Sequence, residues 1–180
     1  MSSTCDTGVE QLPGKQWVVL LREHQQHLLK LSPAEFAEAA RPFVEEAKLP
    51  IGNAYPAAAA AVQEKVRLLS EVPAALGFLL TEEISLDPEA QAKVAKNAAA
   101  KALLEALADA FESLPDWSAE TAKNAIGEAA KANGAKPGQL MFPTRVALSG
   151  KAGGPDLGDI LDLLGQETSA KRVRELAQAL

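Results

Sequence analysis

The sequence has few of the residues that build disulfides, metal sites and membrane spans. Its one cysteine, Cys5, excludes a disulfide framework within the chain and fits a reducing compartment. Its two histidines, His24 and His27, have no third ligand nearby, so a solvated helix face is favoured over a metal site. No apolar run reaches the roughly 20 residues that a membrane-spanning helix needs. We therefore expect a cytoplasmic protein with no membrane segment and no metal.

Aromatic residues are also scarce, at 4% of the chain, whereas hydrophobic residues make up 47% and alanine dominates. This composition favours close-packed helices over a sheet, which would need more β-branched and aromatic side chains. Residues 1–16 have neither the cationic start nor the apolar core of a signal peptide, and we expect them to be a disordered lead-in.

Helix signals divide the rest of the chain at the segment Thr81–Asp87, which interrupts the helical pattern. Before it, the sequence predicts helices over 17–30, from the capping box at Ser32 to about Lys48, over 56–69, and an apolar segment over 74–80. After it, the sequence predicts a long helix from Asp87 that reaches Phe111, a helix capped by Ser118, a helix carrying Arg145, a helix from Pro155 stopped by Gly165, and a last helix ending at Leu180. The predicted fold is all-α, with two consecutive small helical bundles at 17–82 and 83–180.

Catalytic motifs are missing from this pattern. Gly150-Lys151 resembles the end of a phosphate-binding P-loop, but that motif needs Gly and Ser or Thr where Arg145 and Ala152 stand. Two histidines in one N-terminal helix cannot assemble a nucleophile–base pair. We expect no catalytic residue in this chain.

Charge is unevenly distributed along the chain, whose formal net charge is −6. Residues 81–120 hold nine acidic and three basic residues, a balance of −6, whereas residues 121–151 hold five basic residues against Glu128 alone, a balance of +4. Such a basic island is typical of a nucleic-acid contact. From charge alone, chance clustering on solvated helix faces is the favoured explanation.

The end of the chain carries three motifs in order: P-T-R-V-A-L-S-G at 143–150, G-P-D-L at 154–157 and L-L-G-Q-E at 163–167. This order resembles the end of bacterial glutamyl-tRNA synthetase, which reads P-L-R-x-A-L-T-G, a short loop with Pro, L-L-G-K-E, and a last helix with an Arg such as Arg172. Earlier segments resemble the same family. They are K-L-S-P-A-E-F at 30–36, V-Q-E-K-V-R-L-L-S-E at 62–71, similar to the family's Q-E-R-x-K-x-L-x-E helix, and L-P-D-W at 114–117.

The resemblance implies an anticodon-binding helical cage that recognises the anticodon loop of tRNA(Glu), with tRNA(Gln) left open as a second ligand. The family's H-I-G-H-like and K-M-S-K-S-like signatures have no counterpart in the sequence, so this chain alone is expected to have no activity and no cofactor. ATP and Mg would serve the catalytic domain of the parent synthetase, which is the module's other expected partner. We expect a monomer.

The resemblance also implies which residues contact RNA. Those expected to read anticodon bases are Arg67, Arg145, Gly154, Pro155 and Leu157. The basic island, independently of the resemblance, leads us to expect Lys123, Lys131 and Lys151 at the RNA backbone, and Lys65 is expected at phosphate because its ammonium lacks the planar fork of an Arg. Anticodon bases are single-stranded and are read by hydrogen bonds to their edges and by packing on their faces. Arg145 offers five donors for that purpose, and a glycine loop lets backbone approach closely. Two positions depart from the family pattern, since Gly154 replaces a common Thr and Lys65 replaces a common Arg.

Alternatives remain open at each level. Arg145 could pair with a carboxylate such as Asp156 while the loop only makes a turn, and Lys65 and Arg67 could be ordinary solvated charges. The whole chain could be a free-standing helical protein-interaction module derived from such a domain.

Overall fold

The computed structural model describes residues 14–180, with backbone only for residues 14–20. Residues 1–13 of the lead-in predicted over 1–16 lie outside this range, and its last three residues are helical, so the prediction of disorder is wrong for residues 14–16. Every regular element in the described range is helical. The first group comprises α1 (Gly14–Leu28), α2 (Pro33–Glu46), α3 (Tyr55–Val62) and α4 (Val72–Leu80), with 3₁₀ turns η1 (Gln63–Lys65) and η2 (Leu69–Glu71) before α4. The second group comprises α5 (Pro88–Ala95), α6 (Ala100–Ser113), α7 (Ala119–Ala132), α8 (Pro137–Ser149) and α9 (Leu157–Gln178).

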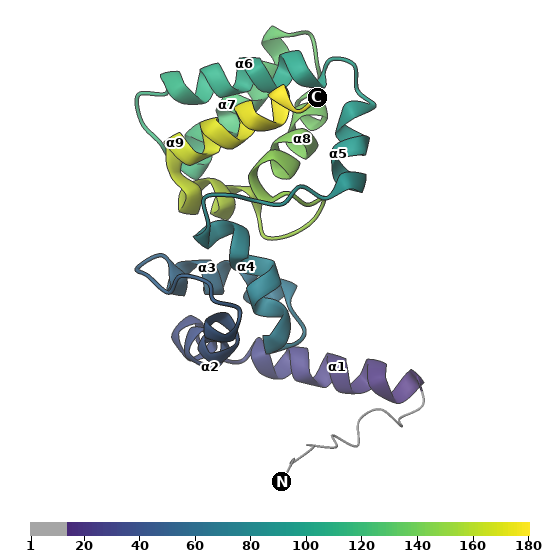
Figure 1. The fold of residues 1–180 in the computed structure, drawn as a ribbon, viewed down its shortest axis with the longest axis vertical. Coiled ribbons are helices and arrows are strands. Elements are labelled where there is room, and N and C mark those ends of the chain that lie inside the picture. The colour runs from purple at the N-terminus through teal and green to yellow at the C-terminus, as the bar shows by residue number, and fades with distance from the viewer. Residues whose placement is uncertain (1–13) are drawn as a thin grey trace.

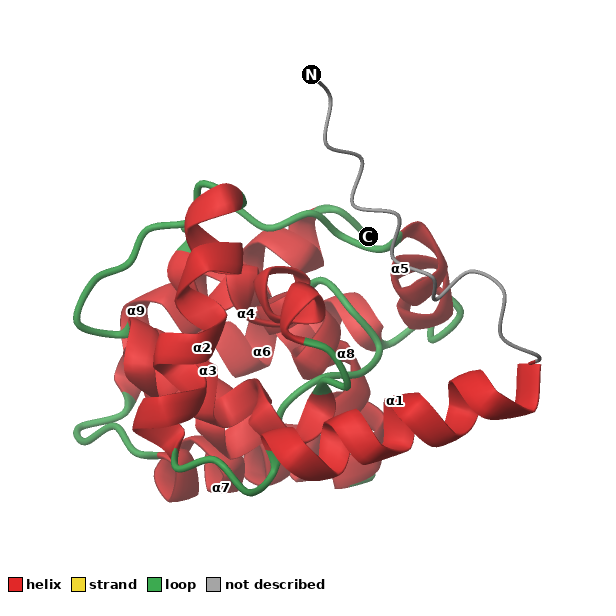
Figure 2. Cartoon of the chain, turned by 90° about the horizontal axis from the view of Figure 1, so that it is seen from below, coloured by secondary structure: helices red, strands yellow, loops and turns green. Residues whose placement is uncertain are grey.

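The two groups of helices lie one beyond the other along the long axis of the molecule (Figure 1). Both views show α1 extending away from the helices that follow it (Figures 1 and 2). The prediction of an all-α fold built from two successive helical bundles is confirmed.

Capping residues explain where several helices begin. The Ser32 hydroxyl accepts from the backbone N–H of Glu35, whose carboxylate accepts in return from the backbone N–H of Ser32, as the capping box predicts. Ser118 makes the equivalent exchange with Thr121 at the start of α7. The predicted stop at Gly165 is a kink inside α9, where that glycine has φ 72° and ψ 176°.

The helix predicted over 56–69 ends earlier than expected, at Val62. Beyond η1 the chain is extended at Val66, and the backbone N–H groups of Arg67 and Leu68 donate to the Glu71 carboxylate at 2.7 and 3.3 Å. Burial of Val66, which is 2% exposed, favours this turn over another helical turn. The prediction that Lys65 and Arg67 share one α-helix is therefore wrong.

The long helix predicted from Asp87 to Phe111 is also interrupted. Between α5 and α6 the Asn97 side chain accepts from the backbone N–H of Ala99 at 3.1 Å, which replaces a helical hydrogen bond and redirects the chain. Figure 1 shows the resulting change of direction between α5 and α6.

Each group has its own apolar packing. In the first, Phe36, Val44 and Tyr55 are at most 1% exposed, and the Tyr55 hydroxyl donates to the Ala37 carbonyl at 2.6 Å. In the second, the buried faces of α6 and α9 pack together, and Phe111 meets Trp117 edge-on at 5.1 Å between ring centroids.

Backbone carbonyls and buried side chains join the two groups. Arg172 of α9 is 2% exposed and donates to the carbonyls of Leu148 at 2.7 Å and Thr81 at 2.6 Å. Next to it, the backbone N–H of Asp87 donates to the Gly150 carbonyl at 2.8 Å. These bonds hold the end of α4 and the following segment against the end of α8.

Candidate nucleic-acid interface

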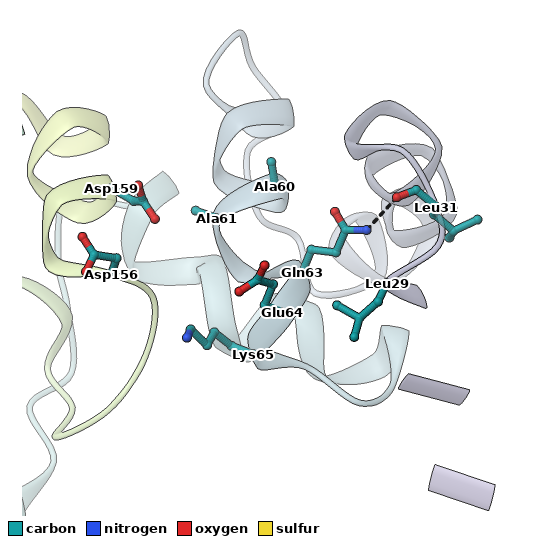
Figure 3. A pocket seen from close by; sticks show the side chains of 9 residues that line it. All are labelled: Leu29, Leu31, Ala60, Ala61, Gln63, Glu64, Lys65, Asp156 and Asp159. Atoms are coloured by element: carbon teal, nitrogen blue, oxygen red, sulfur yellow. Dashed lines mark hydrogen bonds between the residues drawn. The ribbon is translucent and has the colours of Figure 1, made fainter. Parts of the chain in front are cut away.

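A cleft of about 330 Å³ lies where the two groups meet, between the end of α3 and the start of α9 (Figure 3). Its lining residues from the first group are Leu29, Leu31, Ala60, Ala61, Gln63, Glu64 and Lys65, and those from the second group are Asp156 and Asp159. A neighbouring hollow shares Ala60, Ala61 and Asp159 with this cleft and extends to Asp162 of α9. The wall from the first group therefore combines apolar side chains with Gln63, Glu64 and Lys65, and the wall formed by α9 carries carboxylates.

Asp156 begins α9 and is held in place by two donors. Its carboxylate accepts from the Lys123 amino group at 2.8 Å and from the backbone N–H of Gly158 at 2.7 Å. These bonds, that from Lys123 first, lower the pKa of the Asp156 carboxyl below its ordinary value. The carboxylate is thus charged at neutral pH, where a negative charge also suits a helix N-terminus.

Arg145 does not form an ion pair with Asp156. The alternative that named Asp156 as its partner is therefore wrong. The Arg145 Nη1 donates to the Pro155 carbonyl at 2.6 Å, which ties α8 to the loop before α9. Within the described residues this is the one hydrogen bond of its guanidinium, and the residue is half-buried. Since a guanidinium has five N–H donors, most of them remain for another acceptor.

The loop between α8 and α9 presents backbone more than side chains. Gly154 is exposed and has φ 144°, a conformation that residues with a side chain rarely adopt. Pro155 is buried, and Leu157 is 2% exposed because it packs in the core of the second group. The apolar surface at the cleft comes instead from the first group, where Leu29 is 47% exposed.

Of the predicted site residues, Lys65 alone is among those that line the cleft. Lys65 lines it opposite Asp156, and in Figure 3 the Lys65 amino group points toward the α9 side. Arg67 lies in a different hollow, beside Leu21 and Gln25 of α1. The sequence analysis therefore grouped two neighbouring charges that the turn after α3 sends to different surfaces.

Three of the four lysines predicted at the RNA backbone have a partner within the chain. Lys123 pairs with Asp156, and Lys131 pairs with Glu128 at 3.3 Å. Lys151 donates to the Ala74 carbonyl at 2.8 Å. All three are exposed, and exposed pairs of this kind contribute about 1 kcal/mol or less, so a phosphate can compete for these amino groups.

The sequence analysis did not identify Gln63, which is the most buried polar residue of the cleft, at 8% exposure. Its Nε2 donates to the carbonyls of Leu28 at 2.8 Å and Leu31 at 2.9 Å, so it closes the turn between α1 and α2. Its position in the V-Q-E-K-V-R motif could have indicated a role at the site, but the charged residues of that motif, Lys65 and Arg67, were predicted instead.

Two further findings concern the described range. None of its helices is long and apolar enough to cross a membrane. Across residues 14–180, acidic, histidine and cysteine side chains nowhere gather in threes in a geometry that would hold a metal ion.

The fold and the cleft together define an all-α binding module, with apolar surface, acceptors and cations arranged around one groove. Comparison with known proteins gives the family. The chain belongs to the family described as "Anticodon binding domain", whose model matches residues 35–177.

Curated relatives and solved structures agree with this assignment. The chain is 43% identical over 154 residues to a glutamate–tRNA ligase of Akkermansia muciniphila, covering 86% of this chain and 35% of that protein. It is 32% identical over 165 residues to glutamate–tRNA ligase 2 of Halorhodospira halophila, covering 91% of this chain and 34% of that protein. This chain thus spans about a third of the length of these relatives. A crystal structure of a glutamate–tRNA ligase from Elizabethkingia meningosepticum has the same fold, with a TM-score of 0.77 at 24% identity, over 89% of this chain and 32% of that one.

Proposed function

We propose that this chain is the anticodon-binding module of a glutamate–tRNA ligase and that it recognises the anticodon loop of tRNA(Glu) at the cleft between α3 and α9. The observation that carries the proposal is the cleft itself. Seven of its nine lining residues, all except Leu29 and Leu31, lie in the region matched by the anticodon-binding family, and both groups of helices line it. Aminoacylation, with its ATP and Mg, belongs in this proposal to the catalytic part of such a ligase.

The chemistry of the cleft suits bases more than phosphates. Its α9 wall carries Asp156 and Asp159, which repel phosphate but accept hydrogen bonds from base amino groups. Leu29 and Leu31 offer apolar surface to the face of a base. The phosphates would meet cations around the cleft instead, namely Lys65 at its wall and Lys123 beside Asp156.

Arg145 is proposed to read an anticodon base with the donors that Pro155 does not use. Arg145→Ala is expected to remove about 1–3 kcal/mol of discrimination among anticodon variants, by analogy with bidentate base readout in duplexes. Arg145→Lys is expected to restore little of it, because an ammonium lacks the planar fork of the guanidinium.

Binding of this chain to anticodon stem-loops tests both the function and this role. Wild-type protein is expected to bind the tRNA(Glu) stem-loop more tightly than loops with a substituted anticodon base, and to bind more weakly as salt rises. A tRNA(Gln) stem-loop in the same series decides whether that RNA is also accepted. Binding with no preference among loops and no salt dependence would favour a protein-interaction module instead.

Stability separates the two possible roles of Arg145. If Arg145 only braces the Pro155 carbonyl, both substitutions will lower the melting temperature and leave the preference among loops unchanged. Thermal unfolding and stem-loop binding should therefore be measured on each variant.

A further inference from the structure

Gln63 combines burial with a hydrogen-bonding atom that the chain leaves free. The residue is 8% exposed, and both hydrogens of its Nε2 have acceptors, the carbonyls of Leu28 and Leu31. Among residues 21–180, whose side chains the structure describes, none donates to its Oε1, and the residue lines the cleft. In Figure 3 the oxygen lies on the side of the carboxamide away from Leu31. The oxygen is not among the fully buried unpaired atoms of the described residues, so water in the cleft can reach it, and a ligand with a donor of its own can replace that water.

The surroundings of this carboxamide determine which way its oxygen and its nitrogen point. A 180° turn of the amide would place Oε1 against the two carbonyl oxygens of Leu28 and Leu31, neither of which has a hydrogen to donate. The two carbonyls belong to the turn between α1 and α2, and Gln63 directly follows the buried Val62 at the end of α3. Gln63 therefore presents an acceptor to the cleft, and packing on both sides of the side chain keeps it in place.

The surroundings of this acceptor match a nucleobase. Leu29 and Leu31 supply apolar surface near the carboxamide, and Lys65 supplies a cation two residues further along the chain. A base has apolar faces and a hydrogen-bonding edge, and it is attached to a phosphate. Such a ligand needs three kinds of group: an acceptor for the edge of the base, apolar side chains for its face and a cation for the phosphate.

We propose that Gln63 is a specificity-determining residue of this cleft, whose Oε1 accepts a hydrogen bond from the Watson–Crick edge of one anticodon base. The proposal rests on the proposed function and adds the chemistry of one contact. A fixed acceptor favours a base that presents an N–H or amino group at that point. It disfavours a base that presents a carbonyl there, because two facing acceptors both lose their hydrogen bond.

The first experiment leaves the protein unchanged and alters the RNA. Each anticodon nucleotide of the tRNA(Glu) stem-loop is replaced in turn by an analogue without its Watson–Crick donor. The analogues are the 2-pyrimidinone riboside for cytidine, 3-methyluridine for uridine and purine riboside for adenosine. Loss of one neutral hydrogen bond is expected to weaken binding by about 3- to 10-fold.

The second experiment pairs Gln63→Met with Gln166→Met. The Gln166 Nε2 also donates to two carbonyls of a turn, those of Phe111 at 2.7 Å and Leu114 at 3.0 Å, but Gln166 does not line the cleft. Both variants lose a carboxamide that closes a turn, so both lose stability. Binding of the analogue series is then measured for each variant below its melting temperature.

The proposal predicts that Gln63→Met binds the unmodified loop about 3- to 10-fold more weakly and becomes insensitive to the analogue at one anticodon position. Gln166→Met is expected to keep the wild-type sensitivity at every position. Unchanged sensitivity in Gln63→Met at all positions would overturn the proposal and leave the proposed function standing. If Gln63→Met does not fold, the wild-type series decides, and wild-type binding that no donor removal weakens overturns the proposal. Failure of the wild type to bind the unmodified loop would overturn the proposed function itself.

Discussion

The two groups of helices close one of their turns in the same way, but with a different consequence. In α1–α4 the carboxamide of Gln63 holds the carbonyls of Leu28 and Leu31, and in α5–α9 that of Gln166 holds those of Phe111 and Leu114. Only Gln63 is part of the cleft. The comparison teaches that a side chain which closes a turn becomes a candidate binding residue when a second bundle packs nearby and a cleft lies between them.

The groups also differ in what they bring to that cleft. The first contributes apolar side chains, one amide and the charges of Glu64 and Lys65, whereas the second contributes only the carboxylates of Asp156 and Asp159. Neither group alone encloses the cleft. Its shape therefore depends on the joint between the groups, which is formed by the segment 81–87, the end of α8 and Arg172. Two substitutions at the joint and two tests of charge probe this division.

Gly150→Ala is expected to have the largest effect, because it breaks the joint. Gly150 has φ +73°, and an added Cβ would lie 2.3 Å from the Ser85 carbonyl oxygen. The strained backbone and the clash together should cost about 2–5 kcal/mol of unfolding free energy, measured by urea denaturation. The matched control is Gly127→Ala in α7, where no atom lies within 4 Å of the added carbon, and stability should stay equal or rise by up to about 1 kcal/mol. Equal losses in both variants would contradict the role of Gly150.

Arg172→Met removes the side chain that links α9 to both ends of the joint. Burial lowers the pKa of the Arg172 guanidinium, so its charge is held by carbonyls in a poorly solvated place. The variant leaves these carbonyls without their donor and should lose about 2–4 kcal/mol. The control, Arg174→Met, loses only exposed ion pairs with Asp109 and Glu112 and should lose much less stability than Arg172→Met. A loss in Arg172→Met as small as in the control would show that the joint does not depend on this residue.

Replacing lysines tests which surface of the second group meets the RNA backbone. The triple change to Ala at Lys123, Lys131 and Lys151 should weaken binding to cognate and non-cognate tRNA alike, since phosphate contacts carry no sequence information. The slope of log affinity against log salt should fall by about 2, as expected for three lost contacts to a single strand. The control changes three exposed lysines of the acidic segment, Lys93, Lys96 and Lys101, to Ala, and it should leave the slope nearly unchanged. A loss confined to cognate tRNA would place the first three lysines at bases instead.

The pair between Lys123 and Asp156 should give a small pH dependence to the second group. The pKa of Asp156 is lowered from its ordinary value of 3.8, so its contribution to stability is present above that value and is lost as pH falls through the lowered one. The effect should be below about 1 kcal/mol, because the carboxylate is 62% exposed.

The test compares the change in unfolding free energy between neutral pH and pH of about 3 in the wild type, in Asp156→Asn and in Asp159→Asn. Asp156→Asn should lose less unfolding free energy on acidification than the wild type. Asp159→Asn should lose as much as the wild type, since Asp159 makes no ion pair within the described residues. An identical acid loss in the wild type and Asp156→Asn would contradict the assignment.

Much of the fold could be predicted because the signals are local. Ser32 and Ser118 begin helices through bonds to residues three positions away, and Gly165 bends α9 where its backbone takes a positive φ. The breaks after Val62 and at Asn97 were missed, because alanine-rich sequence continues a helix readily unless tertiary packing ends it. The RNA-contact roles assigned to Arg67, Arg145, Gly154, Pro155 and Leu157 remain predictions.

The sequence by itself determined the helical class, most helix starts and the family, since capping, composition and motif order need no knowledge of distant contacts. Only the tertiary structure decided that Lys65 faces Asp156 while Arg67 does not, and that Arg145 donates to a backbone carbonyl while Lys123 takes the carboxylate. It also decided that Gln63 has a free oxygen in the cleft. These contacts depend on how the two bundles pack against each other. A long polar side chain has many possible partners of similar energy along the sequence, so the packing of the bundles determines which one it contacts.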